Sequence, residues 1–215
     1  MYVEITNLTK TIKGKPVLRD VTAGFERGTI YGIVGPNGSG KTMLLRAICG
    51  FIRPDTGTVS IGGKPVEFNR KLPESVGVII ENPGFILAQS AMDNLRYLAD
   101  INYAFDEQET MRLLTVFGLQ DHVNEKVKSY SLGMRQKLAI VQALMEHQPL
   151  IALDEPTNGL DEHSVAMFLE EMRHQRSLGH TVIIASHHSD ELHQIADRLY
   201  TMADGVLSTR QTKEA

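Results

Sequence analysis

The chain has 215 residues, which is enough for one large domain with a substantial buried core. Its formal net charge of −4 gives no electrostatic footprint for nucleic acid, so no DNA or RNA partner is expected. Cys49 is the only cysteine, which excludes an intrachain disulfide and fits a reducing cytosol, and every apolar run is far shorter than the roughly 18–20 residues that span a bilayer.

Strand-like segments fill most of the first eighty residues, and the N-terminal MYVEITNLTK lacks a signal-peptide pattern. The first two strands are joined by a turn around Gly14 and Pro16, and the pair Gly62 and Gly63 is typical of a hairpin. The predicted strands of this region are Tyr2–Asn7, Val17–Phe25, Thr29–Val34, Thr58–Ile61, Lys64–Val66 and Val76–Ile80.

From Ser90 onward the pattern becomes helical, and Ser90 with Asp93 resembles a capping box. A second helix is predicted over Phe105–Phe117, and a third is predicted to end near Pro149. A helical insert over about residues 84–149 therefore interrupts a mixed α/β core. The predicted elements after the insert are a helix over Glu162–Leu178, the strand Thr181–Ala185, a helix over Ser189–Ala196 and a closing hairpin with Asp204 and Gly205 at its turn.

The stretch GPNGSGKT at residues 35–42 carries the strongest functional signal. It matches the phosphate-loop pattern G-x-x-x-x-G-K-[ST] and stands between a predicted strand and a predicted helix over Met43–Cys49. Its glycines let successive N–H groups face one anion, Lys41 can reach the terminal phosphates, and the Thr42 hydroxyl can bind magnesium. The residues expected to hold the nucleotide here are Gly35, Pro36, Asn37, Gly38, Ser39, Gly40, Lys41, Thr42 and Met43.

Two further segments indicate phosphate chemistry. LIALDE, at residues 150–155, is an apolar strand that ends in Asp154, placed to hold magnesium, and Glu155, placed to polarise an attacking water. YSLGMRQ, at residues 130–136, leads into a helix on which Ser131 is a plausible N-cap and Gly133 allows an anion to approach the helix end. Taken alone, this second segment fits an ordinary Ser-capped helix equally well.

With these motifs in order, nearly the whole chain resembles the ATP-binding subunit of an ABC transporter. GPNGSGKT resembles Walker A, SLGMRQ stands where the signature LSGGQ belongs, and LIALDE resembles Walker B. NGLD, ending at Asp161, resembles the D-loop, and Ser186-His187 stands at the switch-histidine position. The resemblance implies a single domain over residues 1–215 with the α/β P-loop NTPase fold: a RecA-like core, an antiparallel β subdomain and a helical subdomain.

The resemblance also implies an ATPase site with ATP and Mg²⁺ as cofactors. Glu155, His187 and Lys41 are the expected catalytic residues, and Thr42, Asp154 and Glu81 the expected metal ligands. The expected nucleotide contacts outside the phosphate loop are Ile12, Ser131, Leu132, Gly133, Gln136 and Asp161. His188 is the alternative to His187 at the switch position; the remaining histidines form no metal-ligand pattern and are expected at the surface.

Two positions depart from the family pattern. Ile12 stands where an aromatic residue usually stacks on adenine, so weaker base binding is expected, with Tyr2 as an alternative stacking residue. Glu81 replaces the usual glutamine of the Q-loop; we expect its carboxylate to be solvated without nucleotide and to approach Mg²⁺ when ATP binds. Glu81 and the SLGMRQ signature together resemble lantibiotic-immunity and bacitracin-type exporters.

The implied partners are a separate transmembrane permease and a second cassette, either a copy of this chain or a paralogue, in a head-to-tail dimer. The expected function is to power export of a peptide antibiotic or drug from a cytoplasmic position on the inner face of the membrane. Phe85, Ile86, Leu87 and Tyr97 either contact the permease or fill the insert's own core. The alternative function is a non-transport ABC-type ATPase that regulates a membrane complex; the long insertions of DNA-repair relatives and the second cassette of translation-factor relatives are absent from the sequence.

Overall fold

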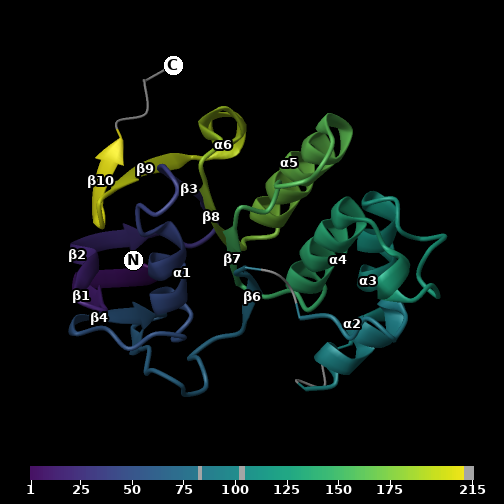
Figure 1. Ribbon diagram of the computed structural model, residues 1–215, viewed down its shortest axis with the longest axis horizontal. Helices are drawn as coiled ribbons and strands as arrows, with labels where there is room; N and C mark the ends of the chain where they lie inside the picture. Colours follow the sequence, from purple (N-terminus) through teal and green to yellow (C-terminus); the bar gives the residue numbers. More distant parts are fainter. Residues whose placement is uncertain (82–83, 102–104, 211–215) are drawn as a thin grey trace.

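A computed structural model describes residues 1–81, 84–101 and 105–210 of the chain (Figure 1). Two β-sheets occupy the left and centre of this view, and the helices α2 (Ala91–Ala99), α3 (Glu107–Val116) and α4 (Leu132–Leu144) group at the right. Within the described residues, no helix combines the length and the apolar character that a membrane span requires.

The smaller sheet is antiparallel, with the strand order β2-β1-β4-β5. Lys13 and Gly14, with φ angles of 48° and 77°, make the predicted turn between its first two strands. Pro16 lies inside the second strand, opposite Thr11, which is tolerated because this strand is at the edge of the sheet. The four strands are β1 (Val3–Ile12), β2 (Lys15–Phe25), β4 (Thr56–Ile61) and β5 (Lys64–Pro65).

The larger sheet has six strands in the order β10-β9-β3-β8-β7-β6. All neighbouring pairs are parallel except β10 and β9, which form the predicted closing hairpin around Asp204 and Gly205. The carboxyl ends of the parallel strands therefore share one edge, where ligands of such sheets bind. The strands are β3 (Ile30–Val34), β6 (Val76–Ile79), β7 (Leu150–Asp154), β8 (Thr181–Ser186), β9 (Arg198–Ala203) and β10 (Val206–Arg210).

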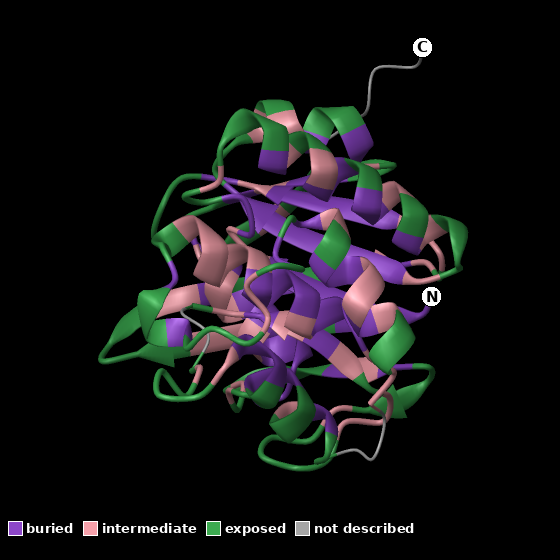
Figure 2. Ribbon diagram, turned by 90° about the vertical axis from the view of Figure 1, so that its right-hand side faces the viewer, coloured by how far each residue is buried: buried purple, intermediate pink, exposed green. Residues whose placement is uncertain are grey.

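Each parallel strand is covered on both faces, as the side-chain alternation along β8 demonstrates. Ile183 and Ala185 belong to the apolar cluster shared with α1 (Lys41–Ile48) and the antiparallel sheet. Val182 and Ile184 belong to the cluster on the opposite face, which includes residues of α4, α5 (Glu162–Ser177) and α6 (Ser189–Ile195). Figure 2 shows the buried strands running between partly exposed helices. A strand buried on both faces explains the continuous apolar runs in the sequence.

The helices on the right of Figure 1 pack through apolar stripes that include Leu95, Leu113 and Leu138, all fully buried in one cluster. Ser90 caps α2 by accepting a hydrogen bond from the Asp93 N–H at 3.0 Å, as predicted. The short 3-10 helix η1 (Val127–Ser129) precedes α4. The predicted apolar face of α4 is confirmed: Leu138, Val141, Leu144 and Met145 are all buried.

Several predicted boundaries were wrong by two residues or more, among them the following three. Strand β1 was predicted to end at Asn7 but continues to Ile12. Asn7 has a φ of 49° at an irregularity in the pairing, and the strand resumes after it. Helix α1 begins at Lys41, two residues before the predicted Met43. Helix α4 stops at Leu144. Lys41 and Thr42 therefore lie in the first turn of α1. The early end of α4 leaves a loop between α4 and β7.

A partly buried ion-pair network joins α3 to α5. Arg112 of α3 donates to both carboxylate oxygens of Glu171, at 3.0 and 2.7 Å, and also pairs with Glu109 at 2.7 Å. The Glu171 side chain is only 4% exposed and also accepts a hydrogen bond from Gln175. The network therefore fixes α3 against the helix that packs on the larger sheet.

Candidate nucleotide-binding site

The loop 35–40 folds tightly between β3 and α1. Gly38 and Gly40 have φ angles of 79° and 114°, which favour glycine. A Cβ on Gly35 would stand 2.1 Å from the Met202 carbonyl oxygen, so a side chain is excluded there. Lys41 is buried, and its Nζ donates to the carbonyl oxygens of Gly35 at 2.7 Å and Pro36 at 3.2 Å. The ammonium group is thus held inside the loop at the start of a helix, where an anion is favoured.

A pocket of about 730 Å³ adjoins this loop. Its lining comes from three parts of the chain: the β1–β2 turn, the phosphate loop with the start of α1, and two acidic residues that follow β6 and β7. The structure thereby brings together several predicted site residues that are distant in sequence. The lining residues are Ile12, Lys13, Lys15, Val17, Asn37, Gly38, Gly40, Lys41, Thr42, Met43, Glu81 and Glu155.

The β1–β2 turn supplies the predicted base-contact residue. Ile12 is 38% exposed and lines the pocket together with Lys13 and Lys15, two lysines that sequence reasoning did not single out. The alternative residue Tyr2 lines a different pocket; its hydroxyl donates to Glu74 at 2.8 Å. The structure therefore contradicts the idea that Tyr2 covers the base in this pocket.

The residues predicted to bind magnesium are adjacent. The Thr42 hydroxyl donates to Asp154 Oδ2 at 2.6 Å, whereas Asp154 Oδ1 is buried and has no hydrogen-bond partner within the described residues. Burial raises the pKa of Asp154, and the neighbouring charges of Glu155 and Glu81 raise it further, against the lowering effects of Thr42 and Lys41. A divalent cation would satisfy the free oxygen and remove this penalty, so a hydroxyl and carboxylates in this arrangement fit Mg²⁺.

Glu155 lies at the end of β7 and its carboxylate is directed at the end of β8. It accepts hydrogen bonds from the Ser186 hydroxyl at 3.1 Å and from the His187 backbone N–H at 3.1 Å. His187 Nδ1 lies 2.9 Å from the same carboxylate, and Lys41 Nζ lies 3.5 Å away. By contrast, the His188 backbone N–H donates to the Ser186 hydroxyl at 3.0 Å. The geometry therefore favours His187 over His188 as the residue associated with the predicted base.

The signature and D-loop residues lie outside this pocket. Ser131 accepts a hydrogen bond from the Met134 N–H at 3.2 Å and caps α4, while Leu132 is 71% exposed. Gln136 donates to the Pro156 carbonyl, and Asp161 caps α5 by accepting from the Ser164 N–H. Gly133 packs near the D-loop, since a Cβ there would stand 3.1 Å from the Gly159 carbonyl oxygen. None of these residues is part of the lining of the pocket at the chain's own phosphate loop.

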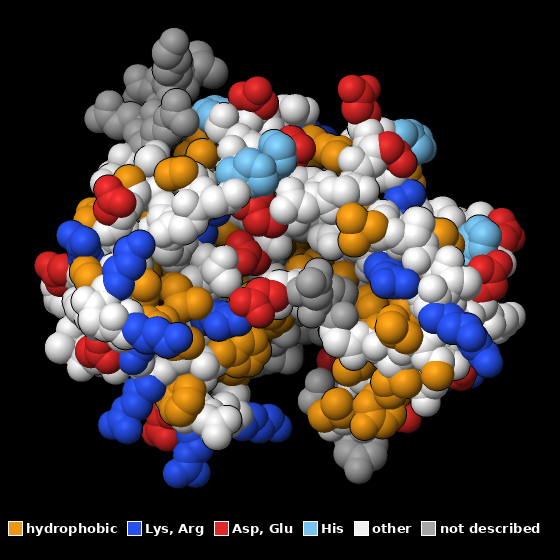
Figure 3. Space-filling model, viewed as in Figure 1, with side chains coloured by type: hydrophobic (Ala, Val, Ile, Leu, Met, Phe, Trp, Pro, Cys, Tyr) orange, Lys and Arg blue, Asp and Glu red, His pale blue; other side chains and the backbone are white. Residues whose placement is uncertain are grey.

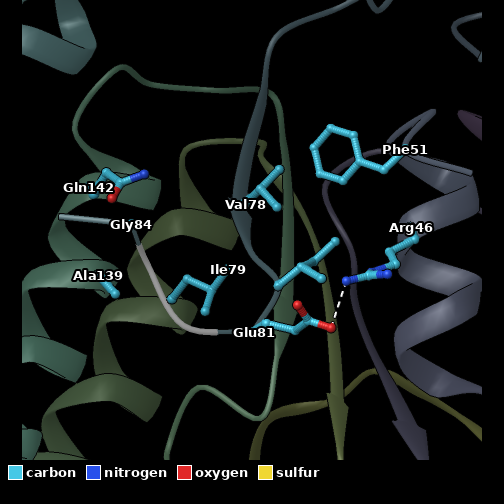
Figure 4. A pocket seen from close by; sticks show the side chains of 9 residues that line it. Arg46, Phe51, Val78, Ile79, Glu81, Gly84, Ala139 and Gln142 are labelled. Atoms are coloured by element: carbon cyan, nitrogen blue, oxygen red, sulfur yellow. Dashed lines mark ion pairs between the residues drawn. The ribbon is translucent and has the colours of Figure 1, made fainter. Parts of the chain in front are cut away.

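Glu81 is largely exposed, as predicted, but it also has a partner that the prediction did not include. Its carboxylate is 63% exposed, yet it forms an ion pair with Arg46 at 2.6 Å instead of being solvated alone (Figure 4). The following residues 82–83, part of the same predicted loop, lie outside the described residues. Sequence reasoning missed Arg46, although its spacing of four residues from Thr42 on a helix was a signal that both occupy one face.

Comparison with known proteins decides the family. Residues 18–158 match the sequence model of the family described as ABC transporter. The chain belongs to the ABC transporter family. It is an ATP-binding subunit with an ABC ATPase domain, and the predicted fold class is confirmed. A solved ATP-binding subunit of an ABC transporter aligns with a TM-score of 0.85 and 27% identity, over 97% of this chain and 90% of that chain.

Three curated ABC transporter proteins extend this likeness. The chain is 40% identical over 209 residues to the uncharacterized ABC transporter ATP-binding protein YybJ of Bacillus subtilis, covering 97% of this chain and 96% of that protein. It is 35% identical to the bacitracin transport ATP-binding protein BcrA of Enterococcus faecalis, over 95% of this chain and 67% of that protein. It is 32% identical to the lantibiotic transport ATP-binding protein SrtF of Streptococcus pyogenes, over 95% of this chain and 88% of that protein.

Proposed function

We propose that this ABC ATPase binds ATP with Mg²⁺, hydrolyses the ATP in a head-to-tail dimer, and powers a separate transmembrane permease. The observation that carries the proposal is the convergence of Lys41, of Thr42 bonded to Asp154, and of Glu155 bonded to His187 around one pocket. Phosphoryl transfer to water needs these three groups together: a phosphate cradle, a metal site and a residue that orients the water.

Glu155 takes the proton of the attacking water in this mechanism, and its bonds to Ser186 and His187 fix the orientation of its carboxylate. His187 presents Nδ1 to Glu155, which leaves Nε2 to contact the γ-phosphate. Lys41 exchanges its two carbonyl partners for phosphate oxygens, a stronger contact because both groups are charged. Magnesium, when bound, supplies the positive charge that neutralises the phosphate oxygens.

The position of the signature residues supports the proposed dimer. Ser131, Leu132 and Gly133 stand at the exposed start of α4, outside the pocket of their own chain. We propose that they contact the nucleotide held by a second cassette, either a copy or a paralogue. Gln136 and Asp161 then have a supporting role. Gln136 holds the loop after β7 in place, and Asp161 holds the start of α5. ATP in the interface stabilises the dimer, and hydrolysis releases it.

The permease contact is proposed on the helical part of the chain, residues 84–149, which we treat as a helical subdomain of one domain. Ile86, Leu87 and Tyr97 are 40%, 48% and 59% exposed, whereas Phe85 packs against the core cluster. Figure 3 shows hydrophobic side chains gathered at the lower right, over α2. A contiguous exposed apolar patch marks an interaction site. Docking there would hold the chain peripherally on the inner face of the cell membrane.

The transported substrate is proposed from the relatives. Two of them are named for bacitracin and lantibiotic transport and are 35% and 32% identical to this chain over 95% of its length. The chain also carries Glu81 and the SLGMRQ signature that pointed to such transporters. We therefore propose a peptide antibiotic, or a drug of similar character, as the exported substrate.

The nucleotide part of the proposal is tested by ATP binding to the purified chain. Lys41→Ala should weaken binding of MgATP in calorimetric titration, because it removes a charge that contacts phosphate in the ground state as well as the transition state. Lys64→Ala, at an exposed lysine on β5, is the matched control and should bind as the wild type does. Wild-type affinity in the Lys41 variant would contradict the phosphate-loop assignment.

The transport part is tested in bacteria that co-express the chain with a candidate multi-span permease. The wild-type pair should raise the bacitracin concentration needed to stop growth, and the same pair with Glu155→Gln should not. Equal resistance in the two strains would refute export driven by this ATPase, while leaving nucleotide binding untouched.

A further inference from the structure

The ion pair between Arg46 and Glu81 forms part of a second pocket, of about 510 Å³, between α1, β6 and α4 (Figure 4). Arg46 Nη2 lies 2.6 Å from Glu81 Oε1, and the Arg46 side chain is 29% exposed. Phe51, Ile79 and Gln142 contribute to the same pocket. Glu81 is thus held by a charged partner in this second pocket.

Glu81 lines both pockets, since it also belongs to the lining of the nucleotide pocket with Lys41 and Thr42. The Thr42 hydroxyl donates to Asp154 at 2.6 Å, so this pocket places the Glu81 carboxylate near a second carboxylate of like charge. Arg46 follows Thr42 by one helical turn on α1 and faces the same side. The Glu81 carboxylate therefore stands between Arg46 on one side and the Thr42–Asp154 metal site on the other.

The backbone of Glu81 has a φ of 63°, a conformation that residues with side chains rarely adopt. Such a conformation persists only where its surroundings hold it. Repulsion from Asp154 and attraction by Arg46 act on the carboxylate in the same direction, away from the metal site. A divalent cation reverses the first of these forces and leaves the second.

We propose that Arg46 is a positioning residue that competes with Mg²⁺ for Glu81. It retains the carboxylate in the second pocket, and loading of the metal with ATP transfers the carboxylate to the nucleotide side. This inference rests on the proposed function, because it takes Glu81 as a ligand of the nucleotide-bound metal. A glutamine at position 81 would carry no charge for Arg46 to hold, so the competition depends on the glutamate of this chain.

The test measures how strongly magnesium promotes nucleotide binding without turnover. The quantity is the Kd of AMP-PNP in EDTA divided by its Kd in excess Mg²⁺, obtained by calorimetry on the purified full chain. Arg46→Gln should raise this ratio by about 1.5-fold to 5-fold, the range expected when a partly exposed ion pair no longer competes. Arg46→Lys keeps a positive charge and should stay near the wild-type ratio. This variant therefore distinguishes the loss of charge from a general disturbance of the fold.

The decisive comparison repeats the change in a Glu81→Gln background. There Arg46→Gln should leave the ratio unchanged, because no ion pair exists to be broken. The matched control is Arg173→Gln, which breaks a surface pair with Glu170 of 3.0 Å on α5 and should not alter the ratio.

An equal effect of Arg46→Gln in both backgrounds, or no effect in the wild-type background, would overturn the inference. Absence of any magnesium dependence in the wild-type chain would instead refute the proposed metal site, so the two failures are distinguishable.

Discussion

Replacing Glu155 with glutamine tests the centre of the proposed mechanism. The carboxylate has neutral donors in the Ser186 hydroxyl and the His187 N–H, each at 3.1 Å. A glutamine oxygen can accept from these donors, so the side chain should keep its place. The variant loses the ability to take a proton and the attraction of Lys41 Nζ at 3.5 Å.

The expected magnitude follows from the chemistry of a positioned base. General-base catalysis contributes about 10²–10⁴-fold, so kcat should fall at least about 100-fold, which corresponds to about 2.7 kcal/mol of barrier. Nucleotide binding should stay largely intact, because Lys41, Thr42 and the phosphate loop are unchanged. Bound ATP that is not hydrolysed should then trap the dimer.

The assay is phosphate release under saturating MgATP, combined with size-exclusion chromatography with and without ATP. Glu67→Gln is the matched control, because this acid is 69% exposed and remote in sequence from the motifs. The control should hydrolyse ATP at the wild-type rate and form no trapped dimer. A Glu155→Gln variant with kcat within about tenfold of the wild type would fall below the smallest contribution expected of a general base and would refute the role.

Two further predictions concern the base contact and the link between helices. Ile12→Tyr should tighten adenine nucleotide binding by about fivefold, the low end of base–aromatic stacking, whereas Ile101→Tyr at a 67% exposed position should not; no gain in calorimetry would disprove the base contact. Arg112→Met should lower the free energy of unfolding in urea by about 3 kcal/mol, the low end for a broken buried pair, because Arg112 is 35% exposed while Glu171 is 4% exposed. Adding Glu171→Met should recover part of the loss, and equal losses in the single and double variants would contradict the pairing.

The strands and phosphate loop could be predicted from the sequence because their signals are local. Thr181–Ser186 is an apolar run because both of its faces are buried, and Lys41 and Thr42 follow a fixed pattern of glycines. The order of strands in the larger sheet depends instead on pairing between distant segments: β3 lies between β8 and β9, which come about 150 residues later. No local pattern specifies such an arrangement.

Contacts between distant residues bear on the parts of the site that the sequence left open. The choice between His187 and His188 was ambiguous in a run of two histidines, and the 2.9 Å contact of His187 with Glu155 favours His187. Tyr2 was the alternative residue for the base, but it lines a different pocket and its hydroxyl donates to Glu74. Likewise, the partner of Glu81 is Arg46, 35 positions earlier, and side-chain chemistry alone named no partner for it.

The backbone conformation of the two glutamates in the nucleotide pocket indicates why the sequence could not predict the whole site. Glu81 and Glu155 follow β6 and β7, which are neighbours in the sheet, and their φ angles are 63° and 48°. Local preference disfavours this conformation for glutamate, so the surrounding fold must supply the energy that maintains it. For Glu155 that support includes the bond from its backbone N–H to the Ala185 carbonyl at 2.8 Å, and for Glu81 it includes Arg46. Local backbone preferences therefore fail to predict the conformation of Glu81 and Glu155, which both line the nucleotide pocket. Functional sites are the positions where such preferences are expected to be overridden.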